Sequence, residues 1–166
     1  MRVRVMQPGE GSVLREIFRD AVRAIDPEHY SAEQVRLWAA RAPDMELWRD
    51  ESAGRLVLVA EDGSGVVGFA SLERDGHIDH LYVRPTRQGC GVGLTLLREV
   101  EACSASVEAE RLFTEASICA RPVFERAGFS VISVQRVEIG GVGFQNYRME
   151  KLLALRFGVA LLRMPK

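Results

Sequence analysis

Hydrophobic residues recur at two spacings along the chain, and the order of these spacings predicts its elements. Spacings of three and four residues indicate amphipathic helices, whereas short apolar runs bounded by Gly, Pro or Asp indicate strands. We therefore expect strands at 2–6, 55–60, 66–72, 77–83, 112–117, 129–138 and 142–149, and helices at 12–25, around 35–38, and at 92–103 and 120–127. Asp-Gly pairs separate three of the strands, which predicts an antiparallel meander.

One stretch departs from the antiparallel pattern. The strand at 77–83, the helix at 92–103 and the strand at 112–117 form a strand–helix–strand unit, which suggests one parallel crossover within an otherwise antiparallel sheet. The predicted class is mixed α/β, of the α+β type, with a single domain over residues 1–151. Residues 152–166 form an apolar extension, which we expect either to pack on this domain or to form a dimer contact.

Length, charge and cysteine content narrow the function. A chain of 166 residues suits one domain, and 22 basic against 23 acidic residues give a net charge of −1, which argues against a nucleic-acid partner. The three cysteines lack zinc spacing and form no disulfide framework. No apolar run resembles a signal peptide or a membrane span. We expect a cytoplasmic protein with no metal and no membrane contact.

The segment Gln88-Gly89-Cys90-Gly91-Val92-Gly93 carries the clearest chemistry. It follows a predicted strand and opens a predicted helix, so its backbone N–H groups and the helix N-terminus should form a cradle for a pyrophosphate. A nucleotide-binding P-loop would need Gly-Lys-Ser/Thr here, and a dinucleotide fingerprint would need a third glycine where Leu94 or Leu96 stands. Both alternatives therefore fit poorly.

Gln88-x-x-Gly91-x-Gly93 resembles the coenzyme A pyrophosphate loop of the GNAT (Gcn5-related) N-acetyltransferases. The flanking segments are also similar to that family: His80-Leu81-Tyr82-Val83-Arg84-Pro85 before the loop, and Ala120-Arg121-Pro122-Val123-Phe124-Glu125-Arg126-Ala127-Gly128-Phe129 after it. The resemblance covers roughly residues 2–150. It is closest to uncharacterised bacterial members that carry segments like Tyr30-Ser31-Ala32-Glu33-Gln34 and Thr114-Glu115-Ala116-Ser117.

This resemblance implies transfer of an acetyl group from acetyl-CoA to a primary amine of a small molecule, by direct attack in a ternary complex. The backbone of the strand before the loop is expected to line the acetyl group and to supply an oxyanion N–H. The residues implied to bind acetyl-CoA are Leu81, Tyr82, Val83, Gln88, Gly89, Cys90, Gly91, Val92, Gly93, Leu94, Ser117, Arg121 and Phe124. The side chains of residues 81–83 are expected to be core.

Two groups compete for the role of general base. His77 stands where some relatives have a glutamate, and strand alternation should place Asp79 on its face to orient the imidazole. Each could instead be a surface or structural residue. Glu115 lies in a strand that should be central; as a buried carboxylate it would either bind the amine or pair with an arginine.

The sequence defines less clearly which group protonates the thiolate and which amine accepts the acetyl group. Phe124 stands where many relatives have a tyrosine that protonates the thiolate, so Tyr147 or water could supply that proton. Nearby, Cys119 is expected to be a small buried thiol. Tyr30, Glu33, Trp38 and Trp48 could line the acceptor site or be core and surface residues. Arylamines, polyamines, amino acids and protein N-termini all remain open as acceptors, and a non-catalytic acyl-CoA-binding module is the alternative function.

Overall fold

The structure is a computed structural model that describes residues 1–46, 54–104 and 109–153. Its elements follow the order predicted from the sequence. They are β1 (Arg2–Val5), α1 (Gly11–Arg23), α2 (Ala32–Ala40), β2 (Arg55–Asp62), β3 (Gly65–Glu73), β4 (Ile78–Val83), the 3-10 helix η3 (Pro85–Arg87), α3 (Val92–Cys103), β5 (Arg111–Ser117), α4 (Arg121–Arg126), β6 (Ser130–Ile139) and β7 (Val142–Leu152).

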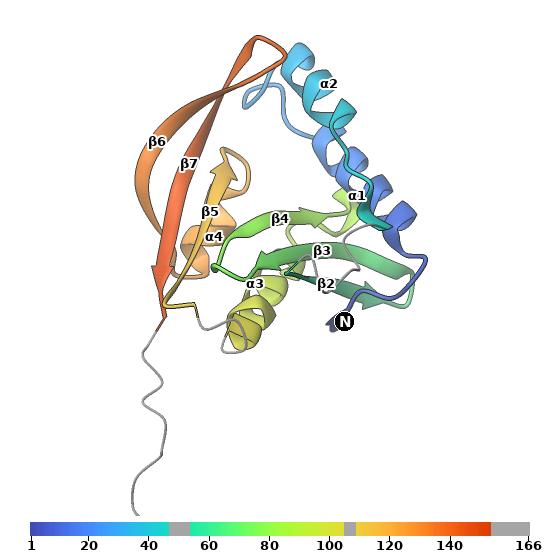
Figure 1. Cartoon of the computed structure of the whole chain (residues 1–166). Coiled ribbons are helices and arrows are strands. Elements are labelled where there is room, and N and C mark those ends of the chain that lie inside the picture. The colour runs from blue at the N-terminus through green and yellow to red at the C-terminus, as the bar shows by residue number, and fades with distance from the viewer. Residues whose placement is uncertain (47–53, 105–108, 154–166) are drawn as a thin grey trace, which may run out of the picture.

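The strands form two sheets rather than the single sheet expected. One has the order β1-β2-β3-β4 and the other β5-β7-β6, and every ladder in both is antiparallel. The predicted parallel pairing of β4 with β5 is reduced to one bridge between His77 and Phe113, with the Phe113 N–H donating to the Gly76 carbonyl at 3.0 Å. Beyond this bridge the two strands diverge, and the space between the sheets opens (Figure 1).

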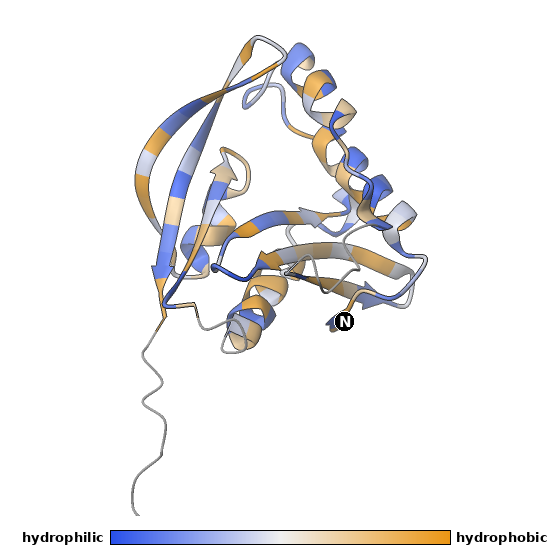
Figure 2. Ribbon diagram, viewed as in Figure 1, coloured by the Kyte–Doolittle hydropathy of each residue, from blue (hydrophilic) through white to orange (hydrophobic). Residues whose placement is uncertain are grey.

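The first sheet is covered on both faces. Leu14, Ile17 and Phe18 of α1 pack with Val57, Val59 and Phe69 on one face. On the other face, Leu96, Leu97 and Val100 of α3 pack with Leu58, Ala60 and Ala70. Because successive residues of a strand point to opposite faces, the run from Val57 to Ala60 is buried throughout. Figure 2 shows the resulting hydrophobic bands along α1 and the inner strands.

Local signals set several boundaries. The capping box predicted at α2 is present: the Ser31 side chain accepts from the Gln34 N–H, and the Gln34 side chain accepts from the Ser31 N–H. Gly128 adopts φ +90° just after α4, as expected for a residue that ends a helix. Gly140 and Gly141, both at positive φ, turn β6 into β7.

The long β6–β7 hairpin reaches across to α2 (Figure 1). Near its tip, the Gln34 side-chain amide donates to the Gly143 carbonyl at 2.7 Å. The hairpin therefore closes one end of the space between the sheets. In the C-terminal extension, Leu153 still donates its N–H to the Glu110 carbonyl, while residues 154–166 lie outside the described residues. No helix in the described part of the chain is long and apolar enough to cross a membrane.

Candidate active site

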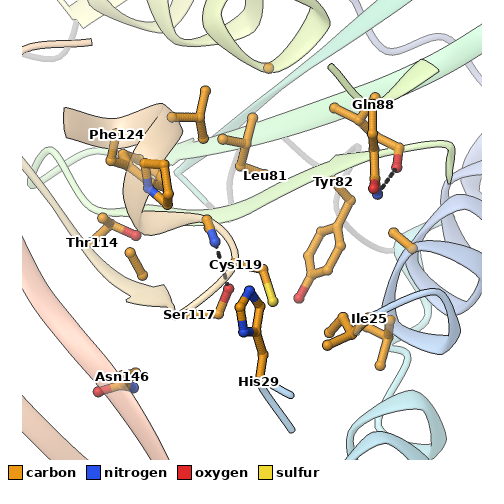
Figure 3. Close-up of a pocket in the computed structure, with 18 of the residues that line it drawn as sticks. Ile25, His29, Leu81, Tyr82, Gln88, Thr114, Ser117, Cys119, Phe124 and Asn146 are labelled. Carbon is orange, nitrogen blue, oxygen red and sulfur yellow. Dashed lines mark hydrogen bonds between the residues drawn. The ribbon is translucent and has the colours of Figure 1, made fainter. Parts of the chain in front are cut away.

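A cavity of about 600 Å³ lies where β4 and β5 diverge. One half is lined by the end of β4, the glycine loop, the start of α3, the end of β5 and α4. The other half is lined by the end of α1, residues 24–30, Trp38 of α2 and the β6–β7 hairpin. Figure 3 shows side chains from both halves converging on this space. We call them the loop half and the hairpin half.

The glycine loop has the geometry of an anion cradle. Gly89 and Gly91 have φ values of +74° and +82°, and a Cβ built on either would meet no atom within 4 Å. Gly91 is the N-cap of α3, whose first-turn N–H groups have no partner within the helix. The Gln88 side chain donates to the Val83 carbonyl at 3.1 Å and ties the loop to β4 (Figure 3). An anionic ligand can therefore approach this backbone closely.

Most residues predicted to bind the cofactor line this cavity. All of them do so except Cys90, which is exposed at the loop, and Arg121, whose guanidinium stacks on the Tyr147 ring. Arg126, which the sequence analysis did not select, lines the cavity from the C-terminal end of α4.

The backbone of β4 offers donors to the cavity. Arg84 donates its N–H to the Val67 carbonyl of β3, whereas the Val83 carbonyl faces the other way and accepts from Gln88. Since alternate residues of a strand direct their backbone groups to opposite edges, the N–H groups of Leu81 and Val83 point away from β3. They point towards the side on which β5 has diverged.

The charged groups beside the cavity pair differently from the prediction. His77 contacts Glu73 through Nδ1 at 3.1 Å and Glu115 through Nε2 at 2.7 Å. Asp79 instead contacts His80 at 3.0 Å and Arg55 at 3.1 Å. The expected Asp79–His77 pair is therefore wrong. A β-bulge interrupts the alternation: His80 pairs with Ser71 and Ile78 with Leu72, so Asp79 is left without a partner in the register.

His77 joins the two sheets. Its ring stacks on Phe113 of β5 with the ring centroids 4.9 Å apart, and its two nitrogens contact carboxylates from β3 and β5. Burial lowers the pKa of His77, but the hydrogen bonds to Glu73 and Glu115 outweigh this effect, so the net pKa is raised. Only the imidazolium can donate to both carboxylates at once.

Two acidic residues line the cavity at this point. The side chain of Glu115 is 39% exposed, so the expectation that it is buried is wrong, and its partner is His77 rather than the arginine of one of the two alternatives. Burial raises the pKa of Asp79, but His80 and Arg55 outweigh this effect and hold it below its ordinary value. His77 itself does not line the cavity and stands behind Glu115.

The candidate acid groups lie apart from the cavity or lack a proton. Phe124 is buried and packs edge-on against Phe129 at 5.2 Å. The Tyr147 hydroxyl accepts from the Gln145 side chain at 2.9 Å, and Tyr147 is absent from the residues that line the cavity. Cys119 does line it but is exposed, so the expected buried thiol is wrong.

The hairpin half is built from residues that are distant in the sequence. The Tyr30 hydroxyl donates to the Gln145 carbonyl at 2.6 Å and accepts from the Ile118 N–H at 3.0 Å. Tyr30 and Trp38 line the cavity, whereas Glu33 is exposed away from it and Trp48 lies outside the described residues. Sequence reasoning missed Ile25, Asp26, His29, Val137, Ile139, Phe144 and Asn146, since no local motif marks them.

Tyr82 differs from its predicted role in the core. Its ring packs against Phe18 and Phe69, with centroids 4.6 and 5.6 Å away, but its hydroxyl points into the cavity (Figure 3). Burial raises the pKa of this phenol above its ordinary value. Asn146 of β7 also lines the cavity, and its Oδ1 is buried without a hydrogen-bond partner within the described structure.

Comparison with known proteins identifies the family. Residues 27–151 match the family described as the acetyltransferase (GNAT) domain. The chain belongs to the GNAT acetyltransferase family. It is 37% identical over 149 residues to the uncharacterized N-acetyltransferase YafP of Escherichia coli (strain K12), covering 90% of this chain and 94% of that one.

Solved structures of acetyltransferases share the fold. A GCN5-related N-acetyltransferase from Rhodopseudomonas palustris is 33% identical, with a TM-score of 0.82 over 92% of this chain and 95% of that one. The yncA protein of Salmonella typhimurium, solved with its cofactor acetyl-CoA, is 19% identical, with a TM-score of 0.66 over 93% and 94% of the two chains. Family membership makes this chain an acetyl-CoA-dependent N-acetyltransferase and confirms the enzyme prediction.

Proposed function

We propose that the enzyme acetylates the primary amine of a small molecule by direct attack in a ternary complex. The observation that carries this proposal is one continuous cavity with the glycine loop at one end and the hairpin half at the other. Two substrates can lie end to end in it. Binding both at once replaces a bimolecular encounter by a positioned one, which is the main catalytic need of an already activated thioester.

The chain's own groups suit the chemical step. The amine nitrogen forms a bond to the acetyl carbonyl carbon while the carbon–sulfur bond breaks. The N–H groups of Leu81 and Val83 are directed to stabilise the negative charge that develops on the carbonyl oxygen. Glu115 accepts the amine proton, directly or through water, and the departing thiolate takes a proton from solvent, because Phe124 has none to give.

Within this mechanism His77 is a positioning residue. It donates to Glu115 from behind and stands between that carboxylate and Glu73. The hydrogen bond therefore holds the Glu115 carboxylate at the cavity wall. Asp79, held by His80 and Arg55, is the second carboxylate at the wall and contributes to attraction of a cationic amine.

The test is release of free thiol from acetyl-CoA with a panel of amines. Glu115→Gln should lower kcat by about 100-fold or more, since a positioned general base contributes on that order. Glu138→Gln, an exposed glutamate of β6 away from the cavity, is the matched control and should keep wild-type rates. Equal rates for Glu115→Gln and wild type would remove Glu115 from the mechanism.

Acetyl-CoA binding is measured separately by thermal stability. A ligand at 100 times its Kd adds about 2.7 kcal/mol, or roughly 5–11 °C for a domain of this size. This shift should be the same in both variants. Thermal stabilisation without thiol release for any amine would favour the alternative, a non-catalytic acyl-CoA-binding module.

The proposal extends to localisation and oligomeric state. The described cysteines are all free thiols, which suits a reducing compartment such as the cytoplasm. A homodimer formed through residues 152–166 would lose its dimeric mass in sedimentation when those residues are removed.

A further inference from the structure

The arginine and the acidic side chains that line the cavity lie in different regions of it. Within the described residues, Arg87 on η3 and Arg126 on α4 line it at the loop half, and His29 lines it at the hairpin half. Arg87 is already paired with Asp62 at 2.7 Å. The acidic groups Asp26, Asp79 and Glu115 lie at the hairpin half or at its junction with the loop half. In the part of the chain that the structure describes, no lysine or arginine lines the hairpin half.

The walls of the hairpin half are apolar and closed at one end. Ile25 of the α1 side, Trp38, and the hairpin residues Val137, Ile139 and Phe144 line it. Trp38 packs edge-on against Phe144 with centroids 6.4 Å apart. The hydrogen bonds from Tyr30 and Gln34 to the hairpin bound the space at its far end.

A molecule bound in this region would meet carboxylate groups rather than lysine or arginine side chains of the described residues. The carboxylates of Glu115 and Asp79 line the cavity here and attract an ammonium. A carboxylate placed there would lose part of its hydration, would meet no lysine or arginine among the described lining residues, and would face like charges, with the His29 imidazole as the one basic group described there. Burying an unpaired charge in this way is strongly unfavourable.

We infer that the acceptor is an apolar primary amine that carries no carboxylate, so that α-amino acids are excluded. This inference rests on the proposed function, because it names the substrate class of the same cavity. The ammonium end lies towards Glu115, and the apolar body packs against Trp38, Phe144 and Ile139.

The test uses amines matched with their carboxylated forms. 2-Phenylethylamine is compared with phenylalanine, and pentylamine with norleucine; phenylalaninamide has the size of phenylalanine without its charge. Assays run at about pH 8.5, where ordinary imidazoles carry no charge. We expect kcat/KM for each simple amine to exceed that of its carboxylated form on the order of 100-fold, with phenylalaninamide close to the simple amine.

A reversal variant gives the inference its sharpest test. Val137 lines the cavity from β6 and is 38% exposed, so Val137→Arg adds a cation to the hairpin half without entering the core. It should reduce the discrimination against the carboxylated amines by about 10-fold or more. The matched control is Val134→Arg, on the same strand, 61% exposed and outside the cavity lining, which should keep wild-type discrimination.

A binding measurement separates this inference from the proposed function. Calorimetric titration of each amine into the enzyme saturated with coenzyme A needs no turnover. Tighter binding of the simple amines supports the inference, even if Glu115→Gln were to show that the proposed mechanism is wrong. Equal binding of both members of a pair, or binding of neither pair, overturns the inference, as does equal kcat/KM. Thiol release from acetyl-CoA with any amine of the panel, measured on the same preparation, shows that the proposed function itself still stands.

Discussion

The two halves of the cavity are built from different parts of the chain and by different chemistry. The centre of the loop half is a short continuous segment, Gln88–Leu94, which offers backbone groups and has glycines where a side chain would block approach. The hairpin half uses side chains from residues 21–38 and from residues 137–146, which are about a hundred positions apart. One half offers a ligand backbone atoms that every residue has, and the other offers particular side chains.

Because of this difference, the two halves suit different ligands. A backbone cradle at a helix N-terminus suits a phosphate whatever the rest of the ligand is, so it can serve a common cosubstrate. Apolar walls with a few polar groups suit one class of acceptor. The comparison predicts that changes in the loop half affect acetyl-CoA alone, and that changes in the hairpin half affect the amine alone.

The largest expected effect on the loop half is the loss of acetyl-CoA affinity in Gly91→Asp. Gly91 sits at φ +82° with open space where a side chain would point, and that space is where the ligand's phosphates would lie. A negative charge a few ångströms from a phosphate costs a few kcal/mol at an effective dielectric constant near 20. We expect Kd for acetyl-CoA to rise by about 100-fold or more, measured by calorimetry.

Gly91→Asn is the matched control, since Asn has nearly the same shape and also tolerates left-handed backbone. It should weaken acetyl-CoA binding far less than Asp does. If both variants lost affinity equally, the backbone conformation rather than charge would explain the effect. If neither did, the glycine loop would not be the phosphate site.

The same difference explains how much the sequence could predict. The order of elements, the capping box at Ser31 and the glycine loop follow from local patterns that act over a few positions, and the other loop-half residues follow from the resemblance to the GNAT family. The division into two sheets does not, because the β5–β7 pairing and the single His77–Phe113 bridge depend on contacts between distant residues. Asp79 shows the limit within one strand: its predicted face assumed regular alternation, and one bulge changed its partner.

The hairpin half can be tested through Tyr30. Its hydroxyl joins residues 24–30 to the end of β5 and to β7, and the side chain is 3% exposed. Tyr30→Phe leaves the Ile118 N–H and the Gln145 carbonyl without this partner. The expected loss of stability is about 1–3 kcal/mol, or roughly 2–12 °C in Tm.

The activity of Tyr30→Phe tests whether the two halves of the cavity act independently. KM for the amine should rise, because Tyr30 holds the hairpin against α2, while Kd for acetyl-CoA stays at the wild-type value. Thermal melting and calorimetry on one preparation give both numbers. Equal weakening of the two substrates would mean that the halves are mechanically coupled and that the comparison fails.

The smallest expected effect concerns His77, which stands where the halves and the sheets meet. Its raised pKa means that the folded protein holds this proton more tightly than the unfolded chain does. The stabilisation is therefore fully present below the unfolded pKa of about 6.5 and is lost as pH rises through the folded pKa.

His77→Gln keeps a polar side chain but cannot carry the charge. The Tm difference between wild type and variant should be largest near about pH 6 and should shrink towards about pH 9, with a total near 1 kcal/mol or less, as for other partly exposed ion pairs. A difference that stays constant over this range would mean that stacking on Phe113, rather than the paired charge, is what His77 contributes to joining the sheets.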